Sequence, residues 1–235
     1  MRYLEEYKKV EQQRYDAVAH LYDKETPKNP DLGREEFVQF KLLKEHSSRH
    51  NYHKVLELAC GTGRYFNFVK CNALFGLDIS MNMLRKAQKK RFNKPVFLAQ
   101  ADLFNIPLKD NQFDLVYSIG TLGYHAPLTA ELLLEIGRVL KKKGTFIFTS
   151  NVGDNVSFKH RLFFWLKALA EQLLPFCPSV VKKAVIKKIG FGRYTHTRAH
   201  IANLLNRAGF SVEELKLVMP SVWPQYYVVA CNEKR

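Results

Sequence analysis

The segment 55–66 carries residue types that let a protein backbone pass close to a bound ligand. Its sequence, Val-Leu-Glu-Leu-Ala-Cys-Gly-Thr-Gly-Arg-Tyr-Phe, runs from an apolar stretch into a turn of small residues. Gly61 and Gly63 have no Cβ that could collide with a ligand, and a helix expected over 63–69 would offer free N–H groups at its start. A dinucleotide loop needs a third glycine three residues later. Phe66 stands there, which counts against a pyrophosphate ligand.

Asp78 and His125 each follow an apolar run that is expected to be a strand. Asp78 lies 21 residues after Glu57. In a parallel α/β sheet such an acid sits beside the first loop and can accept hydrogen bonds from both hydroxyls of a ribose; a simple turn residue is the alternative. His125 follows the run 113–118, at a strand end that faces the ligand crevice, so it could take a proton from an acceptor hydroxyl or amine. The alternative is a histidine that only caps or packs.

Short apolar runs alternate with helical stretches from residue 54 onward, the pattern of a parallel sheet with helices on both faces. The runs are rich in Val, Ile, Leu and Phe, as strands buried on both faces are. Strands are expected at 54–58, 73–77, 96–100, 113–118, 145–149, 211–218 and 225–230. Helices are expected at 63–69, 80–91, 129–141 and 198–208.

The first fifty residues are expected to form two helices. Tyr3, Tyr7, Val10, Tyr15 and Val18 give the first a loose apolar face, and a second helix is expected over 34–47, after a break at Pro27, Pro30 and Gly33. The fold class expected for residues 1–235 is one α/β domain with a Rossmann-like, doubly wound, seven-stranded sheet. The sheet should be mostly parallel with a C-terminal antiparallel hairpin, and a helical cap should be inserted at 154–194.

Four ordered motifs between residues 54 and 150 resemble those of class I S-adenosylmethionine-dependent methyltransferases of the type 11 and type 25 kind. Glu57-Leu-Ala59-Cys-Gly61-Thr-Gly63 is similar to motif I, with alanine in place of the first glycine, and Phe-Gly-Leu-Asp78 is similar to motif II. Ala-Asp102-Leu and the run 113–118 resemble the third and fourth motifs.

The resemblance implies that the carboxylate of Asp78 holds the ribose, that Asp102 accepts from the adenine amino group, and that Tyr22 closes over the methionine end of the cofactor. The cofactor-binding residues expected on this basis are Tyr22, Glu57, Ala59, Gly61, Gly63, Asp78, Ile79, Met83, Asp102, Leu103 and Ser118. The implied reaction is a one-step, in-line transfer of the sulfonium methyl group. Alignment could lower its barrier by up to about 7–11 kcal/mol, and His125 is the candidate base, worth about 10²–10⁴-fold.

The acceptor is expected to be read by the segment 154–194, which carries eight Lys and Arg residues and two acids. A cap over the active site, contact with an anionic membrane that presents a lipid or quinone, and contact with RNA are all open. RNA is supported by the net charge of +15 and by the loop 60–65, which is similar to that of methyltransferases acting on tRNA wobble uridines. An O or N nucleophile of a small molecule is preferred, and a cofactor-binding partner subunit without catalysis is the remaining alternative.

Several acceptor classes are disfavoured by what the motifs lack. Ser118-Ile-Gly-Thr has neither proline of the DNA amino-methyltransferases, and no metal-ligand spacing or paired cysteine is visible, so no metal is expected. Four unpaired cysteines and a charged N-terminus predict a cytoplasmic protein. Charged residues and prolines interrupt the apolar stretch 162–181, which argues against a membrane span. The oligomeric state is left open.

Overall fold

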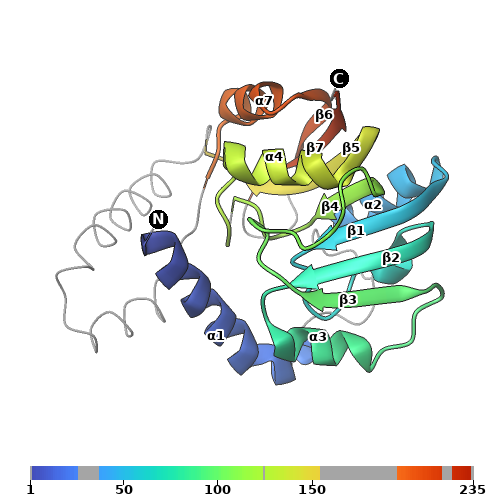
Figure 1. Cartoon of the computed structure of the whole chain (residues 1–235), viewed down its shortest axis with the longest axis vertical. Coiled ribbons are helices and arrows are strands. Elements are labelled where there is room, and N and C mark those ends of the chain that lie inside the picture. Colours follow the sequence, from blue (N-terminus) through green and yellow to red (C-terminus); the bar gives the residue numbers. More distant parts are fainter. Residues whose placement is uncertain (1, 26–36, 124, 154–194, 219–223, 234–235) are drawn as a thin grey trace.

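The computed structural model describes residues 2–25, 37–123, 125–153, 195–218 and 224–233. Seven strands in these ranges form one sheet with the order β3-β2-β1-β4-β5-β7-β6 (Figure 1). β7 is antiparallel to both of its neighbours, and the other adjacent pairs are parallel. The expected fold class is therefore confirmed. The strands are β1 Tyr52–Leu58, β2 Cys71–Asp78, β3 Val96–Gln100, β4 Phe113–Ser118, β5 Leu140–Asn151, β6 Phe210–Val218 and β7 Gln225–Asn232.

The direction in which strands are added to the sheet reverses between β1 and β4. The chain first steps outward from β1 to β2 and β3, and then returns to place β4 on the other side of β1. The carboxyl ends of the two central strands consequently diverge into loops that run in opposite directions. Ligands of doubly wound sheets bind in the crevice at this point, and the residues that follow β1, β2 and β4 are those expected in the site.

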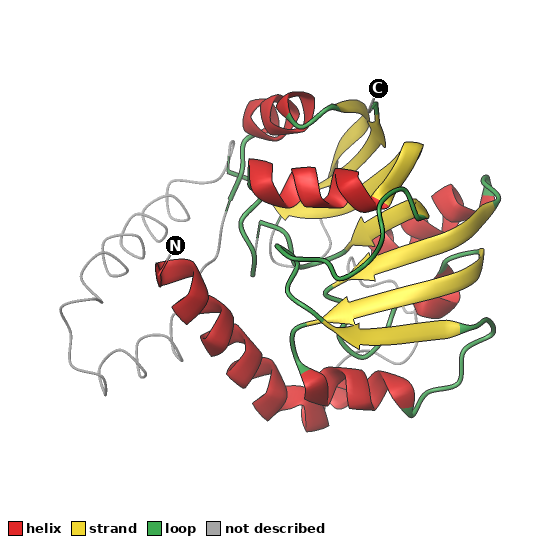
Figure 2. Ribbon diagram, viewed as in Figure 1, coloured by secondary structure: helices red, strands yellow, loops and turns green. Residues whose placement is uncertain are grey.

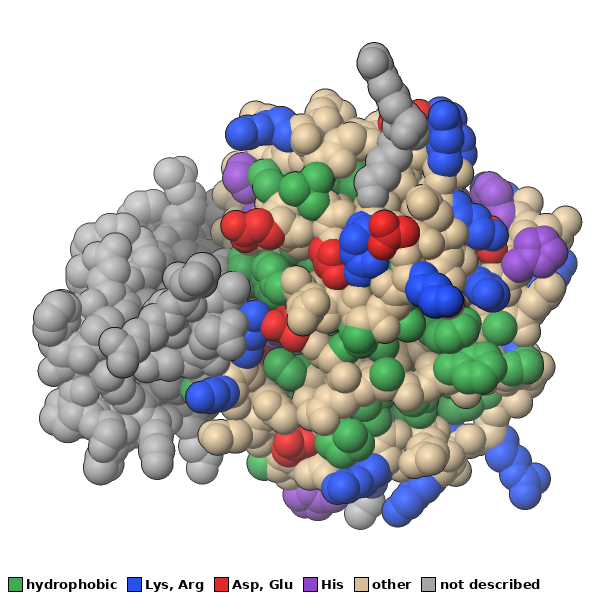
Figure 3. Space-filling model, viewed as in Figure 1, with side chains coloured by type: hydrophobic (Ala, Val, Ile, Leu, Met, Phe, Trp, Pro, Cys, Tyr) green, Lys and Arg blue, Asp and Glu red, His purple; other side chains and the backbone are tan. Residues whose placement is uncertain are grey.

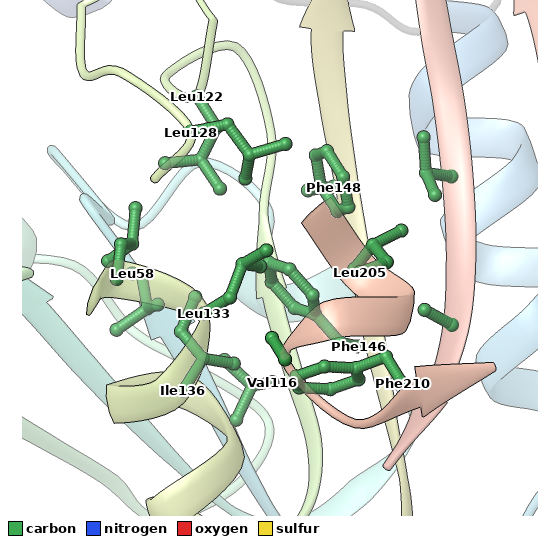
Figure 4. Packing of buried hydrophobic residues seen from close by; sticks show 14 of the residues in the cluster. Leu58, Val116, Leu122, Leu128, Leu133, Ile136, Phe146, Phe148, Leu205 and Phe210 are labelled. Atoms are coloured by element: carbon green, nitrogen blue, oxygen red, sulfur yellow. The ribbon is translucent and has the colours of Figure 1, made fainter. Parts of the chain in front are cut away.

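Helices cover both faces of the sheet (Figure 2). Leucine and isoleucine side chains of α4 (Ala130–Val139) and α7 (Arg198–Arg207) pack in one apolar cluster. Side chains of α2 (Phe37–Ser48), α3 (Met81–Gln88) and the short 3-10 helix η1 (Phe66–Phe68) pack in the other. Figure 4 shows the first cluster, in which Leu133, Ile136 and Leu205 of the two helices lie against Val116 and Phe146 of the strands.

Three of these helices begin at a hydroxyl side chain that accepts a hydrogen bond from a backbone N–H of the first turn. Ser80 caps α3, Thr129 caps α4 and Thr197 caps α7. Such caps satisfy one of the N–H groups that a helix start leaves without a partner. The Ser80 cap fixes the start of α3 at Met81, just after β2 ends at Asp78.

The prediction of a helix over 63–69 is wrong. Gly63 has φ +71°, and its N–H donates to the carbonyl of Cys60 at 2.9 Å, so the chain is still turning where the helix should begin. Only η1 follows, and β2 already starts at Cys71. The segment is rich in aromatic residues, which are weaker helix formers than leucine or alanine, and Phe66 is fully buried between sheet and loop. The packing of this ring, and not helix propensity, therefore determines the backbone conformation of the segment.

α1 (Arg2–Glu25) lies beside the carboxyl ends of the parallel strands rather than on a sheet face (Figure 1). The apolar face expected for it is only partly right, because Val18 is 37% exposed whereas the acid Glu11 is 5% exposed. Polar side chains of α1 contact residues that follow the strand ends. The segment 154–194, expected as a helical cap, lies outside the described residues, as does the break at 26–36. None of the described helices combines the length and apolar character needed to cross a lipid bilayer.

Candidate active site

A cavity of about 300 Å³ lies between α1 and the loops that follow β1, β2, β3 and β4. This volume is at the lower end of the range for small-molecule sites, which is roughly 300–1,000 Å³. The residues expected from the sequence that line it are Tyr22, Glu57, Ala59, Gly61, Asp78, Ile79, Met83, Asp102, Leu103 and His125. Residues from five separate segments of the chain thus share one cavity, at the crevice that the strand order defines.

Two residues expected in the site do not line the cavity. Gly63 belongs to the turn, where an added Cβ would lie 2.7 Å from the ring of Phe66, so its lack of a side chain serves packing. Ser118 is fully buried, and its hydroxyl donates to the carbonyl of Leu58 at 3.1 Å. That bond joins the ends of β4 and β1. Both residues therefore support the loops that line the cavity without contacting the cavity themselves.

Gly61 forms the part of the wall that a side chain would fill. Its φ of +53° is in the left-handed region, and a Cβ there would point toward Tyr22, 4.0 Å from Cε1. Ala59 also has a positive φ, +54°, a conformation that costs a non-glycine residue roughly 1–2 kcal/mol. The loop is therefore held in a tight turn that exposes backbone, and not side chains, to the part of the cavity next to Tyr22.

The Asp78 carboxylate holds this turn in place. One oxygen accepts from the N–H of Gly61 at 2.7 Å and the other from the N–H of Ser80 at 2.8 Å. Burial raises the pKa of Asp78, the two N–H bonds oppose that shift, and the nearby carboxylate of Asp16 adds to it. Each carboxylate oxygen has a second lone pair. Asp78 can thus still accept hydrogen bonds from a ligand on its cavity side.

Glu57 is a second buried acid in the same wall. It is 2% exposed, and the hydroxyl of Tyr117 donates to its Oε2 at 2.7 Å. Burial raises the pKa of Glu57 well above its usual range, and the charge of Asp78 acts in the same direction. A cationic group placed in the cavity would favour its ionised form.

Asp102 pairs with a residue that the sequence did not single out. The ammonium of Lys8, on α1, lies 2.5 Å from Oδ2 of Asp102, and it also lies 5.0 Å from the centre of the Phe104 ring. The other carboxylate oxygen accepts from the N–H of Phe104 at 3.0 Å. In this arrangement α1 reaches over the end of β3 and supplies a cation to the acid expected to bind adenine.

Arg64 brings a positive charge to the cavity wall. Its guanidinium lies 5.7 Å from the centre of the Phe40 ring, and it lines the cavity near Tyr22 and Glu57. No carboxylate in the described part of the chain forms an ion pair with it. An arginine that lacks a protein anion at a cavity wall is suited to hold a ligand carboxylate.

His125 contacts two residues of α1. Its Nδ1 lies 2.9 Å from a carboxylate oxygen of Glu11, and its Nε2 lies 2.7 Å from the hydroxyl of Tyr15. All three residues line the cavity. Tyr124, which precedes the histidine, lies outside the described residues.

Helical spacing could have identified the α1 residues in advance. Lys8, Glu11, Tyr15 and Tyr22 are separated by three, four and seven positions, so they share one face of a helix. A search for apolar residues alone misses this face because two of its members are charged. Arg64 gave no comparable signal, since its role depends on the turn that replaces the expected helix.

The comparisons agree with the fold and with the motifs. Residues 56–148 match the family model described as a methyltransferase domain. An uncharacterized protein of Methanocaldococcus jannaschii is 36% identical over 141 residues, which are 60% of this chain and 51% of that protein. The demethylmenaquinone methyltransferase of Lactiplantibacillus plantarum is 37% identical over 99 residues, which are 37% of this chain and 40% of that enzyme. The chain spans about half the length of the curated relatives it matches.

A solved structure extends the likeness to most of the chain. The S-adenosylmethionine-dependent methyltransferase of Mesorhizobium loti superposes with a TM-score of 0.61 at 19% identity, covering 86% of this chain and 100% of that one. At this identity the likeness concerns the fold. Together with the family match over residues 56–148, it shows that the chain is similar to S-adenosylmethionine-dependent methyltransferases in its central segment and in its fold.

Proposed function

We propose that this protein transfers the methyl group of S-adenosylmethionine to a small-molecule acceptor bound in the cavity below α1. The observation that carries the proposal is the convergence of nine expected cofactor-binding residues and His125 on one cavity at the point where the strand order reverses. Fold alone would not suffice, because one fold hosts many functions. The charges on the cavity wall support this cofactor in particular.

The wall offers a partner for each polar part of the cofactor. Arg64 would hold the carboxylate of the methionine end, and the buried Glu57 would pair with its ammonium group. Gly61 leaves room for the chain that links methionine and ribose, and Asp78 would accept from the ribose hydroxyls. Asp102 and the backbone N–H of Leu103 would bind the adenine ring once the Lys8 ammonium gives way.

The cofactor supplies an activated methyl group on a sulfonium. The protein must therefore align the acceptor, exclude water and, where the acceptor carries a proton of high pKa, remove that proton. Alignment of this kind lowers a barrier by up to about 7–11 kcal/mol. His125 is the candidate base because its ring lies in the cavity wall, in the loop after β4.

A small molecule is preferred as acceptor because His125, the candidate base, lies in the wall of a cavity with a side chain that is only 15% exposed, and not on an open surface. On the face shown in Figure 3 the Lys and Arg side chains are spread over several elements and are mixed with acids and apolar side chains. That face offers no continuous basic stripe for a nucleic acid. RNA and an anionic membrane remain alternatives through the segment 154–194, and the three free cysteines among the described residues support a reducing, cytoplasmic setting.

The test is methyl transfer from isotopically labelled cofactor into a cell extract that has been separated into small-molecule, lipid and RNA fractions. Label in the small-molecule fraction supports the proposal, whereas label confined to RNA or lipid overturns the choice of acceptor. Calorimetry with the cofactor is run in parallel. Tight binding without label in any fraction would favour a non-catalytic partner subunit.

A further inference from the structure

The contacts of His125 give more information about the acceptor than the cavity as a whole. The imidazole is held between Glu11 and Tyr15, which both belong to α1, whereas His125 lies about 110 positions further along the chain. The side chain of His125 is 15% exposed and that of Glu11 is 7% exposed. A carboxylate with so little access to water is costly unless a partner is present. In this site the partners are the guanidinium of Arg14 at 3.5 Å and, closer, the imidazole of His125 at 2.9 Å.

The chemistry of the two neighbours determines which ring nitrogen carries the proton. The 2.9 Å contact between Nδ1 of His125 and Glu11 is an ion-pair contact and not an aligned hydrogen bond, since neither oxygen of Glu11 has a hydrogen-bond partner among the described residues. A carboxylate can only accept, so the arrangement without repulsion between lone pairs is the one with the proton on Nδ1. In the neutral ring Nε2 is then the acceptor, and the hydroxyl of Tyr15 donates to it at 2.7 Å. The nitrogen that is free to take a proton therefore faces a hydroxyl group in the cavity wall.

We propose that Glu11 is a positioning residue that makes His125 a base for hydroxyl acceptors, and that the acceptor's O–H takes the place of the Tyr15 O–H at Nε2. This inference rests on the proposed function and names its substrate class as a neutral alcohol or phenol. Glu11 holds the Nδ1–H tautomer and stabilises the imidazolium that forms. Tyr15 occupies the position until the acceptor arrives.

A hydroxyl acceptor accounts for the base better than other nucleophiles do. The proton of the hydroxyl passes to Nε2 while its oxygen bonds to the methyl carbon, and the electron pair of the breaking carbon–sulfur bond stays on sulfur. A carboxylate acceptor is already ionised, needs no base, and would be repelled by Glu11. A neutral amine attacks through a lone pair that it already has, and an alkylammonium loses its proton before the methyl transfer and not during it, so both gain less from a base in the transition state.

Other charged groups near the imidazole determine how its titration is read. Arg14 lies 3.5 Å from Glu11 on α1, and Lys8, Glu57, Arg64, Asp78 and Asp102 line the same cavity. Among these groups, Glu11 is the one that the structure places against an imidazole nitrogen. Removing its charge should therefore affect His125 more than removing any other.

The first test does not require the cofactor or any activity. The 15N chemical shifts of the His125 ring are followed against pH in the wild type and in Glu11→Gln, with the signals assigned through His125→Asn. The wild type should show the Nδ1–H tautomer. The Gln variant, which keeps the shape of the side chain but loses its charge, should titrate about 1–3 pH units lower.

Asp110→Asn is the control, because Asp110 is an exposed acid that pairs with Arg138 and does not line the cavity. It should leave the His125 titration within a few tenths of a pH unit. Thermal melts of all variants verify that they are folded. An Nε2–H tautomer in the wild type, or an equal shift in the Gln and control variants, overturns the positioning role of Glu11.

The second test determines which classes of acceptor require His125 and Glu11 for turnover. A panel of aryl and alkyl alcohols, amines and carboxylic acids is assayed with wild type, His125→Ala, Glu11→Gln and Tyr15→Phe. Turnover of hydroxyl compounds should fall about 10²–10⁴-fold in His125→Ala, and the acidic limb of the pH profile should move to lower pH in Glu11→Gln. Tyr15→Phe should retain activity within a few-fold.

The two tests separate failure of this inference from failure of the proposed function. Turnover of amines or carboxylates alone overturns the hydroxyl class, and a loss in Tyr15→Phe as large as that in His125→Ala overturns the placeholder role of Tyr15. Absence of any methyl transfer by the wild type, together with the expected NMR shifts, overturns the proposed function while supporting the pairing of Glu11 with His125.

Discussion

At the scale of single residues, Asp78 joins the shape of the loop to the binding of the cofactor. Its oxygens accept from two backbone N–H groups and also face the cavity. Asp78→Ala removes the ribose acceptor and should weaken cofactor binding by about 1.5–3 kcal/mol, measured by calorimetry. It should also lower the melting temperature, because the N–H groups of Gly61 and Ser80 lose their partner.

Asp114→Ala separates these two effects. Asp114 also accepts from two backbone N–H groups, those of His53 and Lys54, but it lies at the start of β4, away from the cavity. This variant should lose stability and bind the cofactor normally. Normal binding by Asp78→Ala as well would show that the ribose lies elsewhere.

Glu57 illustrates how a binding site can reduce stability. Its pKa is raised in the folded state by burial, so the native protein holds a proton that the unfolded chain releases above about pH 4.3. The stability of the fold with respect to Glu57 is therefore greatest below about pH 4.3. It decreases as the pH rises from there toward the raised pKa of Glu57 in the folded protein. Glu57→Gln keeps the acceptor for Tyr117 and removes the penalty. The cofactor-free variant should melt at a higher temperature than wild type at pH 7, and at the same temperature near pH 4.

The same substitution should weaken cofactor binding, because the ammonium group would lose its anionic partner. Exposed Glu45, on α2, provides the control substitution Glu45→Gln, which should change neither quantity. A lower melting temperature for Glu57→Gln at pH 7 would mean that the carboxylate is stabilised in the native state, contrary to its burial.

At the scale of elements, α1 is held over the cavity by polar contacts at several points along its length. Lys8 pairs with Asp102, Asp16 accepts from Ser80 and Asn82, and Asp23 accepts from Thr62 and Lys90. Each such bond contributes about 0.5–1.5 kcal/mol. Because these bonds are individually weak compared with the packing of the sheet, we expect α1 to open more readily than the strands beneath it.

Asp16→Ala should therefore loosen α1 selectively. It removes the bonds to the N-terminus of α3, at a cost of roughly 1–3 kcal/mol in the closed arrangement. Hydrogen exchange should speed up in α1 and leave the amides of β1, β4 and β5 unchanged. Uniformly faster exchange across the sheet would show instead that α1 is part of the global folding unit.

The strands were the elements that the sequence predicted best, and the reason is physical. Strands buried on both faces are continuous apolar runs, so β4 was predicted at the residues where it occurs. β3 was also predicted at its observed bounds, although it is an edge strand in which Phe97 is 53% exposed. The helix expected over 63–69 failed because local propensity does not reveal that Phe66 must be buried. Glu11 and Lys8 were missed because a charged residue on a helix normally faces solvent, and only the tertiary fold places these two at strand ends.

At the scale of the whole molecule, the carboxyl end of the sheet forms the site, and the rest of the sheet forms the apolar core. At the carboxyl end, buried acids, a positive-φ turn and α1 together form a site whose groups are kept at a cost to stability. Elsewhere, two apolar clusters pack the helices on the sheet. We therefore expect the sheet to keep the strand ends in place when a ligand enters the cavity.

Two histidines should govern how the whole fold responds to acid. Burial lowers the pKa of His46 and of His196 to about 4, and the neighbouring His50 and His200 act in the same direction. In the unfolded chain both titrate near pH 6.5. Between these pH values the unfolded chain binds more protons than the folded protein. The contribution of the two histidines to the free energy of unfolding is therefore complete above about pH 6.5, and it is lost as the pH falls toward 4.

Glu57 and Asp78, whose pKa values are raised, have the opposite slope, so the histidine contribution must be isolated by substitution. The free energy of unfolding, obtained from urea titrations between pH 7 and pH 4.5, should fall less steeply in His46→Gln combined with His196→Gln than in wild type. His20→Gln alters an exposed histidine of α1 and serves as the control. Parallel slopes in all three proteins would show that water already reaches both rings in the native state, so that burial does not depress the pKa of His46 or His196.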